Sequence, residues 1–261
     1  MASRPLTLPQ SGFGKTLRRD RWWVAPLSVA AGLALFGGYA TWAIFQGRHY
    51  SWGPYLSPFY SPCLGAQCPA EFRFLEFTWW PFSPAILIMW AVLGFRGTCY
   101  YYRKAYYRAF FFDPPACGVG EFGEHRYRGE RAFPFVLQNL HRYFLYVSIP
   151  IILLLWYDSL RAFFFADGFG IGVGSLILLV NVVLLSGYLL GCHSLRHLVG
   201  GKVDCFSCAN YGGPRHRAWR GASIFNRHHM AWAWTSLIFV CLTDLYIRLV
   251  AAGTIVDIRI L

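Results

Sequence analysis

Charged residues are scarce in this chain, and acidic residues are the scarcest. Asp and Glu number 12 against 24 Lys and Arg in 261 residues, so only 14% of the chain is charged. Soluble proteins usually carry about 25% charged residues, whereas 56% of this chain is hydrophobic. The deficit excludes an ordinary soluble domain and predicts a multi-pass membrane protein. Because basic residues flank the apolar runs, the net charge of +12 indicates membrane topology, and we expect no nucleic-acid partner.

Signatures of a self-contained enzyme are also absent. The sequence has no nucleotide-binding glycine motif, no nucleophile elbow and no HExxH zinc-protease motif. The glycine-rich stretch GFGIGVG leads straight into an apolar run and follows no predicted strand, so it is not a dinucleotide-binding loop. We therefore expect no complete active site within this chain.

Long apolar runs are what the sequence does contain. A helix needs about 20 apolar residues to cross a bilayer, and five runs meet this length, near 23–45, 83–106, 134–165, 170–196 and 229–252. They predict an all-α integral membrane protein, a five-transmembrane-helix bundle. The membrane-anchor domain covers 23–255, between an N-terminal segment, 1–22, and a short tail, 256–261. We expect the second run to form one helix that continues past the membrane surface.

Lys and Arg residues gather on one side of these spans. They are frequent before the first span and in the connections after the second and the fourth, and sparse in the long loop after the first. By the positive-inside rule, the N-terminus is predicted to be cytoplasmic and the C-terminus to lie outside. The protein is thus expected to be a multi-pass membrane protein.

Two acidic residues lie inside predicted spans, each close to an arginine. Asp158 is three residues before Arg161, and Asp244 is four residues before Arg248. Ionisable groups at such depth usually pair or face a polar cavity. The sequence leaves two interpretations open, ion pairs that close the bundle and a proton path to or from a quinone.

The eight cysteines divide between the two sides of the membrane. Cys63 and Cys68 fall in the predicted outer loop, where an oxidising compartment allows a disulfide as well as two thiols. Cys241 lies inside the last span and is expected to be a small core residue. The remaining five gather on the predicted cytoplasmic side: Cys99, Cys117, Cys192, Cys205 and Cys208. In a reducing compartment, clustered Cys and His favour metal binding or redox chemistry.

Histidines are missing from the helices in the outer half of the predicted bundle. Five of them instead lie near the inner membrane surface: His141, His193, His197, His228 and His229. Two stacked bis-His haems need ligand pairs at two depths, so that arrangement is disfavoured. A single haem near the inner surface and an iron–sulfur centre with mixed Cys and His ligands both stay open.

The spacing of these residues favours a histidine pair over a cysteine pair. His193 and His197 are four residues apart, so they share a helix face and both could reach one metal ion. On a continuous helix, Cys192 would be rotated by about 100° from His193. The DCFSC stretch with Cys205 and Cys208 has metal-like spacing, but a single CxxC is a modest signal.

Four stretches follow one another in a distinctive order. They are RGTCYYYRKAYYRAFF with DPPAC, FPFVLQNLHRYFLY, GCHSLRHLVGG, and NRHHMAWAWTSLIFVCLTDLYIRLVAAG. In their residues and their order, over roughly residues 83–255, they resemble the membrane-anchor subunit of an actinobacterial-type succinate dehydrogenase. The resemblance implies a five-helix anchor that docks a flavoprotein and an iron–sulfur subunit on its cytoplasmic side. It also implies a haem-free anchor with a Rieske-type [2Fe–2S] cluster inside the membrane.

The resemblance carries over a set of metal-capable residues by position. They are Cys99, Cys117, Cys192, His193, His197 and His229, of which only four can bind one cluster. The implied function is succinate:quinone oxidoreduction, in which the anchor relays electrons from the iron–sulfur subunit to a quinone. Candidate quinone-binding residues are His141, Arg142, Tyr100 and Trp232. The alternatives are a single-haem cytochrome b anchor and a non-redox membrane protein that uses the same Cys and His residues for zinc.

Overall fold

The computed structural model describes residues 12–63, 68–69, 72, 83–122, 131–133, 135–201 and 203–261. Within these residues, four helices are long and apolar enough to cross a membrane. They are α1 (Val24–Phe45), the segment Val136–Arg161 that contains α4 (His141–Arg161), α5 (Val173–Leu190) and α8 (His229–Ala251). The predicted helical membrane fold is thus confirmed, and these four match the first, third, fourth and fifth predicted spans.

The second predicted span is not one continuous helix, so that expectation was wrong. Helix α2 (Ala85–Gly97) has only 13 residues, and the chain resumes as α3 (Tyr100–Tyr106) and the π-helical turn η3 (Tyr107–Phe111). Between them, Cys99 has an extended backbone, with φ −66° and ψ 132°. Gly97 and the β-branched Thr98 have low helix propensity, which makes this a favourable place for a break.

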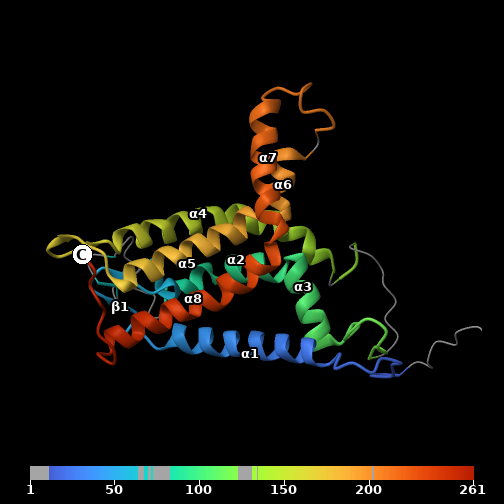
Figure 1. Ribbon diagram of the computed structural model, residues 1–261, viewed down its shortest axis with the longest axis horizontal. Coiled ribbons are helices and arrows are strands. Elements are labelled where there is room, and N and C mark those ends of the chain that lie inside the picture. Colours follow the sequence, from blue (N-terminus) through green and yellow to red (C-terminus); the bar gives the residue numbers. More distant parts are fainter. Residues whose placement is uncertain are drawn as a thin grey trace, which may run out of the picture. The chain divides into compact units, whose positions relative to one another are not determined.

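A similar break ends the fourth predicted span early. Helix α5 ends at Leu190, Cys192 has an extended backbone with φ −63° and ψ 132°, and α6 (His193–Gly200) then begins. The stretch GCHSLRHLVGG is therefore a junction between two helices. Helix α7 (Gly212–Arg227) packs against α6, and the two extend away from α4 and α5 as a hairpin (Figure 1). Arg215 closes this hairpin by donating to the carbonyls of Val199 and Gly201, each at 3.2 Å.

The described residues fall into two units, 1–37 with 96–140, and 38–95 with 141–261. In the second unit, α5 packs between α4 and α8 (Figure 1). Buried small residues such as Gly187 and Ala233 allow these helices to approach closely, while Leu153 and Ile238 are exposed, as lipid-facing side chains are.

The loop after α1 is built around two short structures and a disulfide. Strands β1 (Ser51–Trp52) and β2 (Tyr55–Leu56) form a hairpin, and the 3-10 helix η1 (Pro58–Tyr60) follows. Cys63 and Cys68 are joined in a disulfide, the pairing that the sequence left open. A second hairpin, β3 (Phe164–Phe165) with β4 (Gly168–Phe169), connects α4 to α5.

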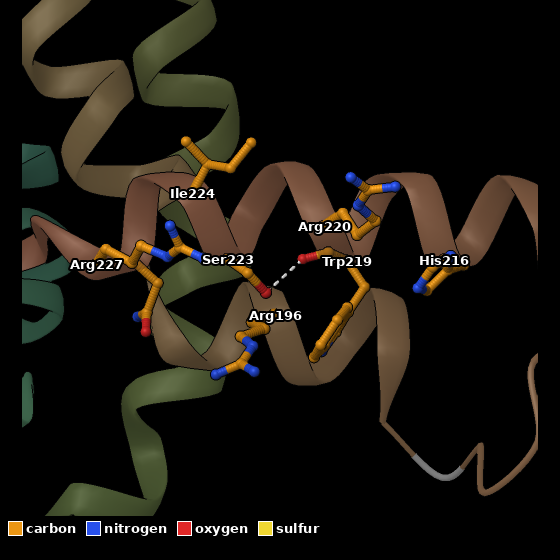
Figure 2. A pocket seen from close by; sticks show the side chains of 8 residues that line it. Arg196, His216, Trp219, Arg220, Ser223, Ile224 and Arg227 are labelled. Carbon is orange, nitrogen blue, oxygen red and sulfur yellow. Dashed lines mark hydrogen bonds between the residues drawn. The ribbon is translucent and has the colours of Figure 1, made fainter.

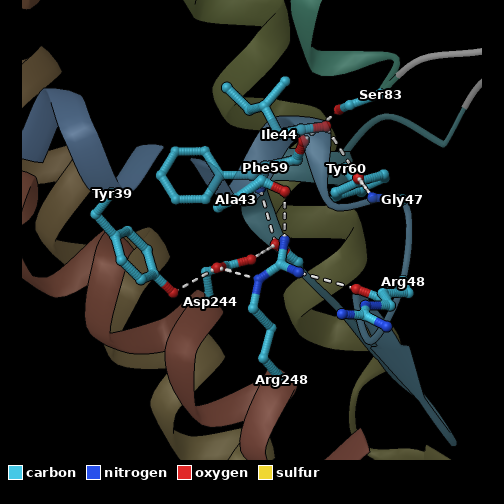
Figure 3. Close-up of polar contacts among 11 residues, drawn as sticks. Tyr39, Ala43, Ile44, Gly47, Arg48, Phe59, Tyr60, Ser83, Asp244 and Arg248 are labelled. Carbon is cyan, nitrogen blue, oxygen red and sulfur yellow. Dashed lines mark hydrogen bonds and ion pairs between the residues drawn. The ribbon is translucent and has the colours of Figure 1, made fainter. Parts of the chain in front are cut away.

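One of the two predicted ion pairs forms and the other does not. The guanidinium of Arg248 donates from Nε to Asp244 at 2.7 Å, and both side chains are buried (Figure 3). Arg248 also donates to two backbone carbonyls, and Asp244 accepts from the hydroxyls of Tyr39 and Ser57. Asp158, in contrast, accepts from the hydroxyl of a loop serine, and Arg161 lies 4.5 Å from the centre of an aromatic ring. Asp158 and Arg161 therefore both contact the loop after α1, and they do not form an ion pair with each other.

The first unit ties the N-terminal segment to the loop after η3. Thr16 and Val119 form an isolated β-bridge, and the Thr16 hydroxyl donates to the carbonyl of Gly118 at 2.7 Å. Arg18 donates to the carbonyl of Cys117 at 2.9 Å and pairs with Asp20. This charge pairing holds the pKa of the exposed Asp20 carboxyl below its usual range.

Candidate functional site

The ends of four helices place chemically active side chains around Cys192. This residue lies between α5 and α6, and its side chain is fully buried. His141 is the first residue of α4, and its Nε2 atom lies 3.2 Å from the sulfur of Cys192. His229 is the first residue of α8 and is only 3% exposed. A thiol and two imidazoles thus occupy the buried end of the second unit.

Aromatic rings fix the orientation of both imidazoles. Phe95 stacks on His141 with ring centres 4.8 Å apart, and Tyr188 stacks on His229 at 4.9 Å. Phe95 and Tyr188 meet edge to face at 5.4 Å. The four rings therefore form a continuous series, from His141 through Phe95 and Tyr188 to His229. Phe95 and Tyr188 each shield one face of an imidazole from water.

Two glycines of the α5 end make room for this arrangement. A Cβ atom on Gly191 would lie 3.0 Å from Nδ1 of His229, and a Cβ atom on Gly187 would lie 2.6 Å from the indole ring of Trp232. Any larger residue would push these side chains away from α5. The amide of Asn226 then donates to the Gly191 carbonyl at 2.7 Å, which connects the end of α7 to the same junction.

The histidine pair of α6 forms as its spacing predicts, but on the surface of the hairpin. The rings of His193 and His197 are 4.8 Å apart and nearly perpendicular, and both residues are exposed. Partial burial, and then the neighbouring charges of His197 and Arg196, lower the pKa of His193. At neutral pH its imidazole is therefore uncharged, the form that can bind a metal. The pair lies outside the buried cluster.

The two predicted cysteine ligands of the first unit differ in exposure. Cys99 is 2% exposed and begins α3 with the same extended backbone that Cys192 has at the start of α6. Cys117 is exposed, and its sulfur lies 3.7 Å from Arg108. Burial therefore favours Cys99 over Cys117 as a ligand.

The donor chemistry of this region can be compared with that of an iron–sulfur centre. Within the described part of the chain, no group of three or more Cys, His, Asp or Glu side chains is arranged to hold a metal ion. Thiolate and imidazole are nevertheless the two ligand types of a Rieske centre, and Cys192 with His141 brings one of each into contact. Cys205 and Cys208 are joined in an exposed disulfide, so neither offers a thiolate here.

The quinone candidates lie in different surroundings. Trp232 points its indole into the interior, and among the described residues its buried Nε1 atom has no hydrogen-bond acceptor. Arg142 is exposed on α4. Tyr100, in the first unit, is 63% exposed, and Arg103 lies over its ring.

Sequence reasoning missed Tyr188, whose one signal is its place as the single polar aromatic residue in the aliphatic run LLSGYLL.

Comparisons with known proteins agree with this placement of the helices. Residues 24–253 match the family described as Actinobacterial succinate dehydrogenase subunit SdhC. A chain in the solved structure of the Mycobacterium smegmatis Sdh1 complex in the apo form is 43% identical, with a TM-score of 0.88. The match covers 100% of this chain and 98% of that chain. No protein in the curated set matches.

Proposed function

Because the chain belongs to the actinobacterial succinate dehydrogenase SdhC family, and is thus a membrane-anchor subunit of that enzyme, we propose that it relays electrons from succinate oxidation to a membrane quinone. The relay would begin at an iron–sulfur subunit docked, with its flavoprotein partner, on the cytoplasmic side. We further propose that the anchor crosses the membrane five times, with α2 inside the second span, and has a cytoplasmic N-terminus. The Lys and Arg distribution supports this orientation in a bacterial inner membrane.

The contact between His141 and Cys192 carries the proposal of a Rieske-type [2Fe–2S] cluster. The sulfur and Nε2 atoms are 3.2 Å apart in a part-buried setting, and His229 is buried at the neighbouring helix start. These three side chains would hold part of the cluster, and Cys99, in the first unit, stays a ligand predicted from the sequence alone. When bound, such a cluster supplies one-electron transfer. His141 therefore moves from the predicted quinone site to the proposed ligand set, while His193, His197 and Cys117 stay predictions from the sequence.

The chain's own groups would prepare this site and receive the quinone. Phe95 and Tyr188 keep the imidazoles oriented and reduce contact with water. The indole Nε1 of Trp232 is a buried donor that could bond a quinone carbonyl oxygen, where negative charge develops during reduction. Arg103, Lys104 and Arg108 on α3 and η3 give the first unit a basic, aromatic surface suited to a soluble subunit.

The contact between His141 and Cys192 favours the cluster over the haem alternative. It brings together an imidazole and a thiol, the two ligand types of a Rieske centre, whereas a haem held by two histidines needs no thiol. The other alternative, a non-redox zinc protein, does not agree with membership of a succinate dehydrogenase family.

Replacement of Cys192 by Ser tests the proposed ligand, and Cys241→Ser on α8 is the matched control because it removes a thiol elsewhere in the bundle. In the purified complex, Cys192→Ser should lower the iron content and reduce quinone reduction to background. Succinate oxidation with an artificial dye acceptor should persist, and Cys241→Ser should resemble the unmodified complex. Unchanged quinone reduction in Cys192→Ser would exclude the ligand role. A stoichiometric b-type haem band in the unmodified complex would exclude a haem-free relay.

A further inference from the structure

A basic cleft lies along the α6–α7 hairpin, apart from the buried Cys and His side chains. It has a volume of about 680 Å³ and is lined by Arg196, His216, Trp219, Arg220, Ser223, Ile224, Asn226 and Arg227. None of the lining residues is acidic, and between positions 191 and 229 the only acidic residue is Asp204. The cleft therefore selects for an anionic ligand. Its volume falls within the range of organic-ligand pockets, about 300–1,000 Å³, and is larger than a lone inorganic anion needs.

One donor in the cleft is left without an acceptor, although the Ser223 hydroxyl donates to the Trp219 carbonyl at 2.7 Å. The guanidinium of Arg196 lies 4.8 Å from the ring centre of Trp219 on α7. Its buried Nε atom has no hydrogen-bond acceptor among the residues that the structure describes. Figure 2 shows Arg196 and Arg227 at the end of the hairpin next to the bundle, with Ser223 between them. A buried donor without an acceptor is costly, so a ligand oxygen at this position would stabilise the cleft.

The position of the cleft along the chain fixes its depth relative to the membrane. Arg196 is six residues beyond Leu190, where α5 ends, and Arg227 is two residues before His229, where α8 begins. In Figure 1 the hairpin runs across the direction of α5 and α8, so both residues stay near the ends of these helices. The polar headgroup layer lies just beyond the hydrocarbon core that such ends reach. Both guanidinium groups therefore belong at headgroup level. Ile224, which is 64% exposed, adds an apolar surface to the same cleft.

We propose that this cleft binds the phosphate-bearing headgroup of an anionic phospholipid from the surrounding leaflet. Arg196 and Arg227 would donate to the phosphate oxygens, the side-chain oxygen of Ser223 or Asn226 would accept from a glycerol hydroxyl, and Ile224 would meet the start of an acyl chain. The proposal depends on insertion of α5 and α8 in a membrane and not on the electron relay, so each can fail separately.

The test uses the purified, delipidated succinate dehydrogenase complex and a fluorescent short-chain phosphatidylglycerol as the probe. Arg227→Gln should weaken its binding about tenfold, because hydrogen bonds to charged groups are the strong ones. Arg217→Gln is the matched control, since it removes the same charge from an exposed position of α7 outside the cleft. Arg227→Lys should recover part of the affinity. Arg196→Gln should weaken binding in the same direction as Arg227→Gln.

Competition experiments separate the possible occupants. Unlabelled phosphatidylglycerol should displace the probe, whereas phosphatidylcholine and inorganic phosphate should not at equal concentration. Equal displacement by phosphatidylcholine, or equal binding by Arg227→Gln and Arg217→Gln, would overturn the proposal. Displacement by inorganic phosphate alone would assign the cleft to a soluble anion. Binding of the probe to the isolated anchor but not to the complete complex would show that the soluble subunits cover the cleft. This result, like displacement by inorganic phosphate alone, would overturn the lipid assignment.

Discussion

Replacing Asp244 by Asn tests whether the end of the bundle beside the loop after α1 is closed by a structural ion pair or carries protons. Asp244 is fully buried and accepts hydrogen bonds from Arg248, Tyr39 and Ser57 (Figure 3). The substitution keeps the size of the side chain but leaves the Arg248 guanidinium, whose side chain is 6% exposed, without its counter-charge. Removal of one partner of a buried ion pair typically costs about 3–5 kcal/mol.

That loss should be visible as a fall in the thermal midpoint of the detergent-purified complex. For a chain of this size, each kcal/mol shifts Tm by about 2–4 °C, so a fall on the order of 10 °C is expected. Tyr39→Phe removes one hydrogen bond and leaves the other acceptor contacts of Asp244, so its effect should be about 1–2 kcal/mol. Asp167→Asn is the surface control, because its pair with Arg259 is exposed and screened by solvent.

The assay pairs Tm with succinate-driven quinone reduction at a temperature where the variant is folded. We expect Asp244→Asn to lose stability and to keep its turnover. If its Tm equals that of Asp167→Asn, the buried pair does not hold the bundle and the reasoning is wrong. A loss of quinone reduction at unchanged Tm would support the proton path that the sequence also allowed.

Three further predictions concern packing. Gly187→Ala places a methyl group 2.6 Å from the Trp232 ring, so tryptophan fluorescence should shift and the KM for quinone should rise. The control Gly37→Ala, with open space around the new methyl group, should change neither quantity. Cys63→Ser opens the disulfide of the loop after α1, whose short loop corresponds to about 2 kcal/mol of chain entropy, so Tm should fall, and reductant should then lower Tm less than it does in the unmodified protein. Arg215→Met removes both hydrogen bonds that close the hairpin, and limited proteolysis should then cleave it faster than in the unmodified protein.

The apolar runs predicted five spans, and four of these are long apolar helices in the described part of the chain, because hydropathy reports burial in lipid, a property that averages over about 20 residues. A helix break depends on one residue, which such an average does not resolve. At Cys99 and Cys192 the only local signals are the preceding glycines in RGTC and GC, and glycine also occurs inside regular spans such as α5. The same limit explains why α7 was missed. Its sequence, GGPRHRAWRGASIFNR, is polar, and its contacts with α6 are tertiary.

The sequence predicts a shared depth for the site but not which residues meet there. Histidines near helix ends on one side of the membrane predict that depth, since position along a span follows from counting residues, and the depth stays a prediction. The relative orientation of Cys192 and His193 was inferred from the 100° rotation of a regular helix. Cys192 is not helical, so that rotation does not apply, and its sulfur contacts His141 from another helix. The contact joins residues 51 positions apart, and no local pattern predicts it.

Cys99 and Cys192 show why the two breaks are connected with function. Each is the residue whose carbonyl accepts the first hydrogen bond of the following helix, from Arg103 and Arg196 respectively. That position usually holds Ser, Thr, Asp or Asn, whose side chains cap the helix and contribute about 1 kcal/mol. Neither cysteine makes a capping hydrogen bond. A local rule is therefore broken twice at buried thiols, which is expected where the thiol has a role other than stability. Serine would supply the missing cap, so Cys192→Ser removes the sulfur without weakening the start of α6.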